Sequence, residues 1–145
     1  MTEYQHSQTG SAILYAISLP GLILLAVGAS SPAARPALFP GLVLILSALL
    51  FWKLTIKIDN ETLRASFGIG LIEKTISIAN IDECEAIRIR WWWGWGIHLT
   101  PYGWLYNVSG LDAVVVTLRD GRSLCLGTDQ PDELVAAIRR VASVR

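Results

Sequence analysis

The residues best suited to recognition chemistry form one short stretch, WWWGW, that follows Arg88 and Arg90 closely. Tryptophan offers a broad apolar ring and one N–H donor, and arginine stacks on such rings or pairs with carboxylate and phosphate groups. On a β-strand, successive side chains point to opposite faces. We therefore expect Trp92 to point outward with the two arginines, while Trp91 and Trp93 continue an apolar row toward the core.

This stretch supports two interpretations. In the first, the tryptophans cover a hydrophobic core or rest at a membrane interface, where tryptophan is enriched. In the second, the stretch is a binding surface with Trp92 as its anchor and the arginines as its polar contacts. Stacking of Arg88 on Trp92 would serve either interpretation. The candidate binding residues are Trp92, Arg88, Arg90, Trp95 and His98.

Residues that could carry catalysis are sparse. The acidic run of Asp82, Glu83 and Glu85 is best explained as the solvated start of a strand. A hypothetical active site would have to combine Glu85, Arg88 and His98. No nucleophile elbow, dinucleotide loop or metal-ligand spacing accompanies them. We therefore expect no catalytic residues, no metal and no cofactor, and the enzyme hypothesis is the remote one.

The two cysteines, Cys84 and Cys125, are far apart in the sequence and form no CxxC motif. Zinc sites need more ligands at closer spacing. Two reduced, buried thiols are the favoured interpretation. A disulfide is the alternative if the domain lies outside the cytoplasm.

Charge is distributed unevenly along the 145 residues. The chain has twelve Lys and Arg and twelve Asp and Glu, yet Glu3 and Arg35 are the members of these groups that precede Lys53. The remainder is charged but balanced. This balance argues against nucleic-acid binding, because a phosphate backbone requires a basic excess.

Two apolar segments, residues 10–28 and 37–52, fill this sparsely charged region. A helix of about 20 residues crosses the hydrocarbon core of a bilayer. We expect a transmembrane hairpin of two antiparallel helices, each kinked or begun at a Pro-Gly pair. Phe51, Trp52 and Lys53 are expected at the membrane interface, because aromatic and basic residues favour that layer.

Positive residues predict the orientation of the hairpin. Lys53, Lys57 and Arg64 follow the second span, whereas the connector between the spans offers Arg35. Basic residues flanking spans stay on the cytoplasmic side. We therefore expect an integral protein of the cell membrane, with its β domain and its N-terminus in the cytoplasm.

From residue 54 onward the apolar pattern changes to period two, as in Leu54, Ile56 and Ile58. Short strands with tight turns predict an antiparallel sheet that closes on itself. The last apolar stripe, over residues 130–143, has helical spacing. The fold class is thus α+β, with a transmembrane hairpin over residues 1–53 and a β domain with a C-terminal helix over residues 54–145.

Several segments then give the chain a resemblance to a known family. They are GWGIH at 94–98, GWLYNVSG at 103–110, DGR at 120–122 and LGTD at 126–129. Residues 10–142 resemble the bacterial PH-like (pleckstrin-homology-like) family of small membrane proteins. The resemblance implies a PH-like antiparallel β-barrel of about seven strands, closed by a C-terminal helix and preceded by one or two spans. In that pattern arginine is commoner at the position of His98.

The first predicted turn, Asp59-Asn60-Glu61, is short and acidic. Phosphoinositide-binding PH domains carry basic residues in their first hairpin loop. The resemblance therefore does not extend to inositol phosphate recognition in that mode.

These observations lead to the hypothesis of a membrane-anchored binding or scaffolding module without catalysis. Its Trp/Arg-rich face would meet lipid headgroups or a protein segment, which an open sheet edge can accept as an added strand. The alternative is a structural subunit of a membrane assembly, formed through the spans by self-association or with another protein. Small residues in the spans would permit close helix approach; they are Ala12, Ala16, Gly21, Gly28, Gly41 and Ala48.

Overall fold

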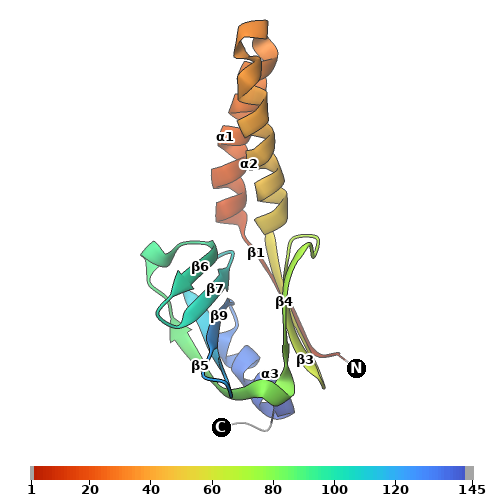
Figure 1. Ribbon diagram of the computed structural model, residues 1–145, viewed down its shortest axis with the longest axis vertical. Coiled ribbons are helices and arrows are strands. Elements are labelled where there is room, and N and C mark those ends of the chain that lie inside the picture. The colour runs from red at the N-terminus through yellow and green to blue at the C-terminus, as the bar shows by residue number, and fades with distance from the viewer. Residues whose placement is uncertain (1, 143–145) are drawn as a thin grey trace.

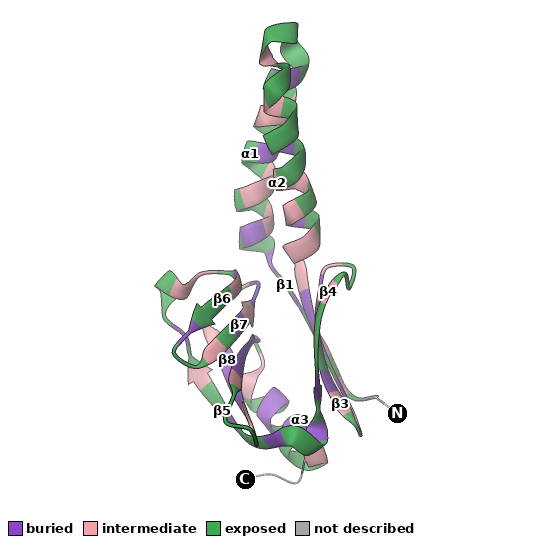
Figure 2. Ribbon diagram, viewed as in Figure 1, coloured by how far each residue is buried: buried purple, intermediate pink, exposed green. Residues whose placement is uncertain are grey.

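A long pair of helices stands on a domain of two β-sheets in the computed structural model, which describes residues 2–142 (Figure 1). The pair consists of α1 (Ser11–Ser30), the 3-10 segment η1 (Pro32–Ala37) and α2 (Leu38–Phe51). By length and composition, α1 and the combined segment η1–α2 could each span a membrane. Most of their side chains are exposed (Figure 2), so the domain does not cover them.

The two helices approach each other at their glycines. A Cβ atom built on Gly21 would lie 3.2 Å from the carbonyl oxygen of Gly41, and one built on Gly41 would lie 3.0 Å from the carbonyl oxygen of Gly21. A Cβ atom built on Gly28 would lie 2.7 Å from the side chain of Leu38 of α2. Pro20 lies inside α1 without ending it. Both Pro-Gly pairs thus contribute glycines to a tight helix contact.

The first sheet contains four antiparallel strands in sequence order. They are β1 (Thr2–Thr9), β2 (Lys53–Asp59), β3 (Thr62–Phe67) and β4 (Ile72–Ser77). Because β1 precedes α1 and β2 follows α2, the helix pair leaves and returns at one point of this sheet. The backbone N–H of Gly10 donates to the carbonyl of Trp52 over 2.8 Å and ties the two feet together.

The second sheet contains five strands in the order β5-β8-β9-β7-β6. Their bounds are β5 (Ile81–Arg88), β6 (Gly96–Thr100), β7 (Gly103–Asn107), β8 (Asp112–Leu118) and β9 (Ser123–Gly127). All neighbours are antiparallel except β7 and β9, which are parallel. The 3-10 segment η2 (Ile78–Asn80) connects the two sheets between β4 and β5.

The C-terminal helix α3 (Pro131–Ala142) agrees with the helix predicted over 130–143. Acidic residues in its first turn and arginines in its last complement the helix dipole. Its apolar face, which includes Leu134 and Ile138, packs with the inner faces of both sheets. The sheets and α3 thereby enclose the larger core cluster, and purple marks the buried residues along their ribbons in Figure 2.

The closed barrel expected from the family resemblance is wrong. Within residues 2–142, β4 pairs with β3 alone and β6 with β7 alone, so no ladder joins the two sheets. The parallel pairing of β7 with β9 explains the difference. This pairing places β7 inside the second sheet, between β9 and β6, and leaves β6 as a free edge. In a simple up-and-down barrel, each strand would pair with the next one in sequence until the sheet closed.

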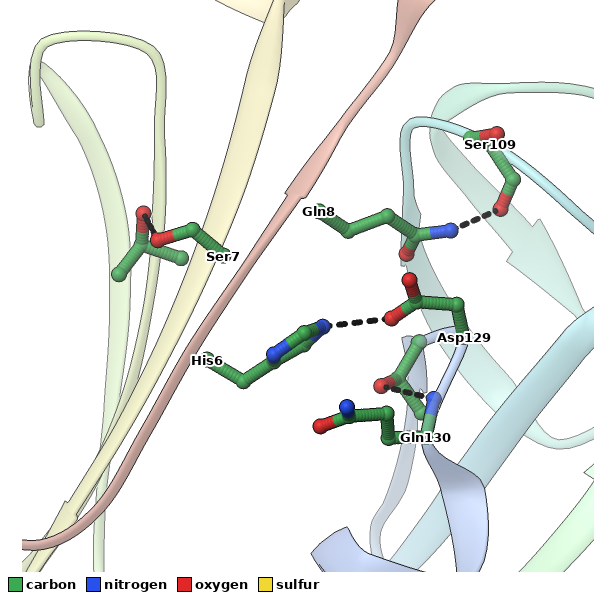
Figure 3. Close-up of polar contacts among 8 residues, drawn as sticks. His6, Ser7, Gln8, Ser109, Asp129 and Gln130 are labelled. Carbon is green, nitrogen blue, oxygen red and sulfur yellow. Dashed lines mark hydrogen bonds and ion pairs between the residues drawn. The ribbon is translucent and has the colours of Figure 1, made fainter.

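β1 is a second departure, because the sequence analysis grouped residues 1–9 with the helix hairpin. The strand TEYQHSQT pairs with β2 along its length. Successive side chains bind to different elements (Figure 3): Nε2 of His6 donates to Oδ1 of Asp129 over 2.5 Å, and Gln8 donates to the Ser109 carbonyl over 2.9 Å. Ser7, on the other face, bonds to Thr55 at 2.9 Å. A polar strand of this kind shows no apolar alternation from which to predict it.

Candidate functional site

The tryptophan stretch is a turn, not a strand. β5 ends at Arg88, and the chain then folds into the 3-10 segment η3 (Trp91–Trp93). Gly94 and Gly96 follow with φ of +68° and +101°, a backbone conformation that residues with a Cβ rarely adopt. The strand alternation expected for the tryptophans is therefore wrong, and the glycines that follow them explain the reversal into β6.

The turn exposes three of its four tryptophans. Trp91 is 74% exposed, although the strand pattern predicted it in the core, and Trp92 is 56% exposed, pointing outward as expected. Trp95 is 42% exposed. Trp93 is half-buried against the smaller core cluster of the second sheet and meets the Tyr102 ring edge-on, with 6.0 Å between ring centroids. The Trp93 ring thus anchors the turn to the second sheet, whereas the other three rings are exposed on the surface.

The cation on Trp92 is Arg90. Its guanidinium carbon lies 5.0 Å from the centroid of the Trp92 ring, so the expected partner, Arg88, is not the residue that stacks. Trp91 meets Trp92 edge-on at 5.8 Å. Arg88 is exposed at the end of β5. The stacked pair holds one charged group and one large ring together on the outside of the turn.

His98 belongs to the same turn. Its Nε2 atom forms a hydrogen bond with the carbonyl oxygen of Trp95, and a Cβ built on Gly96 would lie 3.5 Å from that nitrogen. The imidazole thus folds back over the glycines and is held to the main chain. The structure therefore brings together Arg90 with Trp92, and Trp95 with His98.

The residues of the enzyme hypothesis do not meet. Glu85 and Arg88 lie on β5, and His98 lies on β6. These strands are the two opposite edges of the five-stranded sheet, with β8, β9 and β7 between them. Among residues 2–142, no group of three or more His, Cys, Asp or Glu side chains has a geometry that could hold a metal ion.

A second exposed apolar loop was not predicted from the sequence. Between β3 and β4 the chain runs through Gly68–Leu71, where Ile69 is 76% and Leu71 is 73% exposed. The Gly68 N–H donates to the Lys53 carbonyl over 2.7 Å, and a Cβ on Gly68 would lie 2.6 Å from the Leu50 carbonyl oxygen of α2. The loop therefore abuts the foot of the helix pair.

The tryptophan turn lies at the same end of the domain. β6 begins at Gly96 opposite Asn107, the last residue of β7, and the next residue, Val108, contacts Gly10 at the start of α1. Figure 1 shows the β3–β4 loop beside the foot of the helices and the tryptophan turn at a similar level, on the outer side of the second sheet. We call their exposed apolar residues the helix-proximal rim; they are Ile69, Leu71, Trp91, Trp92 and Trp95.

Phe51, Trp52 and Lys53 sit at this same foot. The Phe51 ring packs edge-on against Phe67 of the core, with centroids 5.3 Å apart. The Lys53 ammonium lies 5.0 Å from the centroid of the Trp52 ring. All three are half-buried. They form the junction between the apolar helix α2 and the first strand after it.

A cleft of about 210 Å³ opens between the two sheets. One wall is β4, including Lys74, and the other carries Trp104 and Tyr106 of β7. Burial raises the pKa of the Tyr106 hydroxyl. Arg122 stands at the mouth and binds Asp120, with Nη2 2.6 Å from Oδ2, and its hydrogen bond lowers the pKa of that carboxyl. The sequence pattern did not reveal this cleft, because it depends on which strands become edges.

Both cysteines are buried free thiols. Burial raises the pKa of Cys84, which Arg139 offsets in part, and burial raises the pKa of Cys125 to about 11. Neither thiol is available to reagents in the folded chain. The expected burial of both cysteines is therefore confirmed, and their reduced state in the cell stays a prediction.

No family model, curated protein or solved structure matches this chain. The kinship to the bacterial PH-like family accordingly stays a prediction. The fold alone defines an α+β protein: an apolar helix pair on a domain of two open sheets, with α3 packed between them.

Proposed function

We propose that this chain is a membrane-anchored module whose helix pair crosses the bilayer and whose helix-proximal rim rests on the lipid headgroup layer. The observation that carries the proposal is the position of the rim. Its exposed apolar side chains lie on two separate loops, and both loops are at the end from which the apolar helices emerge.

Physical chemistry favours this placement of the rim. An exposed apolar surface gains about 25 cal/mol per Å² on leaving water. Tryptophan favours the headgroup layer, where its ring is buried and its N–H stays hydrated. Arg90, stacked on Trp92, and Lys53, close to Trp52, bring positive charge to the same level. Each such cation near an anionic leaflet contributes about 1 kcal/mol.

The distribution of basic residues supports the orientation that we propose. Lys53, Lys57 and Arg64 lie on the domain side of α2, and the connector between the helices carries Arg35. We therefore place the domain and β1 in the cytoplasm by the positive-inside tendency. The domain is, in this proposal, an open variant of a PH-like module, supported by the strand-rich chain and the C-terminal helix α3.

The first hairpin turn does not take part in lipid contact. Its Asp59 carboxylate accepts hydrogen bonds from the backbone N–H groups of Glu61 and Thr62 at 2.9 and 2.7 Å. This turn lies at the far end of β2 from the helices. Lipid binding through the rim is therefore distinct from headgroup recognition by a basic first loop.

The structural-subunit alternative receives less support. Gly21, Gly28, Gly41 and Ala48 are buried within the helix pair. Small residues used inside one hairpin are not free to join a second. Ala12 and Ala16, the other small residues of that hypothesis, are exposed on α1.

The test measures how close the rim and the far turn lie to the lipid headgroups, in proteoliposomes that contain anionic lipid. A fluorophore is attached at Trp92→Cys or Leu71→Cys on the rim, and at Asn60→Cys on the far turn as the matched control. Quenchers on lipid headgroups should quench both rim probes about tenfold more than the control probe, because the interfacial layer is only several ångströms deep. Equal quenching at all three positions would overturn the rim proposal. Release of the chain by alkaline carbonate would overturn the anchor itself.

A further inference from the structure

We propose that the cleft between β4 and β7 binds an extended acidic peptide segment of a partner protein, which adds as a strand to the free edge of β4. The proposal concerns a surface separate from the rim, and it does not depend on membrane docking. Four features of the cleft carry it: a free strand edge, an inward-facing cation, aromatic walls and a lining without carboxylates.

The free edge follows from the hydrogen-bond alternation of β3 and β4. Opposite residues in an antiparallel pair alternate between hydrogen-bonded and non-hydrogen-bonded positions. The N–H of Ile78 donates to the Glu61 carbonyl over 2.8 Å, so Ile78 and Glu61 form a hydrogen-bonded pair. The residues at two-residue steps from Ile78 on β4, such as Ile76 and Lys74, are therefore hydrogen-bonded to β3 as well. Thr75 and Ser77 lie between them, at the non-hydrogen-bonded positions. Their backbone N–H and C=O groups therefore point to the open edge, and both residues line the cleft.

Lys74 is the inward-facing cation. It stands directly opposite Ala65, between the pairs that match Ile72 with Phe67 and Ile76 with Leu63. Directly opposite residues share a face of the sheet. Ala65, Leu63 and Phe67 are buried, so Lys74 lies in the row that faces the core side. Among the ion pairs between described side chains, none involves Lys74.

The rest of the lining suits an extended chain with an acidic side chain. Trp104, 51% exposed, and Tyr106 form the opposite wall, and Leu124 lies beside them. No Asp or Glu lines this cleft within the described chain. Arg122 adds a second cation at the mouth, although Asp120 already binds it. A strand with an acidic residue on its inward face would pair that residue with Lys74, and an apolar residue two positions along, on the same face, would rest on the aromatic rings.

Lys74 has a second explanation, in which it prevents aggregation through the β4 edge. An inward-pointing charge on an edge strand discourages pairing with other chains. The two explanations make opposite predictions for an acidic strand. A guard against pairing would repel every strand, whereas a recognition residue selects acidic strands over basic ones. The experiment separates them by the charge of the probe.

The experiment uses the full chain in lipid nanodiscs and a panel of labelled peptides of about eight residues, the length of a typical strand. In one set, a glutamate or aspartate shares one face of the strand with apolar residues two positions away, and in the matched set lysine replaces the acidic residue. We expect saturable binding of acidic peptides, and amide hydrogen exchange at Thr75 and Ser77 should slow in the complex. N-methylation of alternate peptide bonds should abolish binding, because it removes the main-chain donors.

Two variants locate the site. Lys74→Glu should weaken acidic-peptide binding about tenfold or more, as expected on reversing one member of a charge pair. Lys57→Glu makes the same change on an exposed residue of β2 and should leave binding unaltered. Thermal unfolding of each variant checks that the fold is intact.

Four results would overturn the proposal. The first is failure of all acidic peptides to bind, and the second is equal binding of the lysine set. The third is saturation of the cleft by inorganic phosphate or anionic vesicles in place of peptide, which would identify a simple anion site. The fourth is concentration-dependent pairing of two copies through β4 in the absence of peptide, which would identify a second copy as the occupant.

Discussion

The two ends of the domain are built from the same kind of element, short turns between antiparallel strands, yet their surfaces differ. At the helix end, the turns expose Ile69, Leu71, Trp91 and Trp92. At the far end, Asp59 and Asp120 bind the backbone of the β2–β3 and β8–β9 turns, although the third turn there, between β6 and β7, exposes Tyr102. A turn whose polar groups are satisfied locally can remain in water, whereas an exposed apolar turn calls for another medium. The exposed apolar turns lie at the end where the apolar helices begin, which is the end that a membrane would meet.

The largest loss of stability should come from substituting Gly68 at the helix end, and Gly121 at the far end provides the comparison. Gly68 has φ +51°, and an added Cβ would lie 2.6 Å from the carbonyl oxygens of both Leu49 and Leu50. Gly68→Ala should destabilise the domain by about 3 kcal/mol, because backbone strain and a clash with main-chain atoms add. Gly121 has φ +84° with no atom near an added Cβ. Gly121→Ala should cost about 1 kcal/mol.

Denaturant unfolding in mild detergent, followed by near-ultraviolet circular dichroism, measures both variants. A loss for Gly121→Ala equal to that for Gly68→Ala would show that the rim loop is not clamped to the foot of α2.

Cysteine reactivity should sharpen the contrast between the rim and the interior. The pKa of Cys125 is raised to about 11 by burial, so at pH 8 only about 0.1% of the buried thiol is ionised. We expect a thiol-specific reagent to label Trp92→Cys fully in detergent while Cys84 and Cys125 stay unmodified until the chain unfolds. Mass spectrometry of the labelled chain provides the measurement.

Cysteine labelling also reports topology. Because both native cysteines are buried, labelling of intact vesicles needs an introduced cysteine, such as Asn60→Cys on the far turn. A cytoplasmic domain predicts labelling from the cytoplasmic side alone. Rapid labelling of native Cys84 or Cys125 would contradict their burial.

The smallest effect concerns pH and the far end. Hydrogen bonds lower the pKa of Asp59 and of Asp120 below the ordinary value of 3.8. A lowered folded-state pKa contributes stability that is present above the unfolded value and is lost as pH falls through the folded value. Stability should therefore decline below about pH 3.8. Asp59→Asn with Asp120→Asn should flatten this decline, as measured by thermal unfolding between pH 2 and pH 7.

The rim contains no carboxylate, so Ile69→Ser with Leu71→Ser should leave the slope of stability against pH unchanged. A slope that changes equally in both pairs of variants would show that the acid response does not arise in the far turns.

Much of the framework could be predicted from local patterns. The apolar segments 10–28 and 37–52 match α1 and α2 within a few residues, and the stripe at 130–143 matches α3. Phe51, Trp52 and Lys53 lie where α2 ends and β2 begins, and their place at a membrane interface stays a prediction. These features depend on residues that are neighbours in sequence, and local periodicity reports them well.

The candidate site was predicted only in part. Trp92, Trp95 and Arg90 were singled out and are exposed or paired at the surface. Trp91 was misplaced, because Gly94 and Gly96 turn the chain where a strand was expected. Ile69 and Leu71 were missed, since nothing local distinguishes an exposed apolar loop from the end of a buried strand.

By itself, the amino-acid sequence determined that this chain has two long apolar helices, a strand-rich remainder and an amphipathic last helix, because each depends on composition and spacing over one segment. Only the tertiary structure decided that β1 joins the first sheet, that β7 runs parallel to β9, and that the barrel stays open. Those outcomes depend on pairings between residues far apart in the chain, such as His6 with Asp129 and Trp104 with Leu124. They in turn place the rim at one end and Lys74 in the cleft.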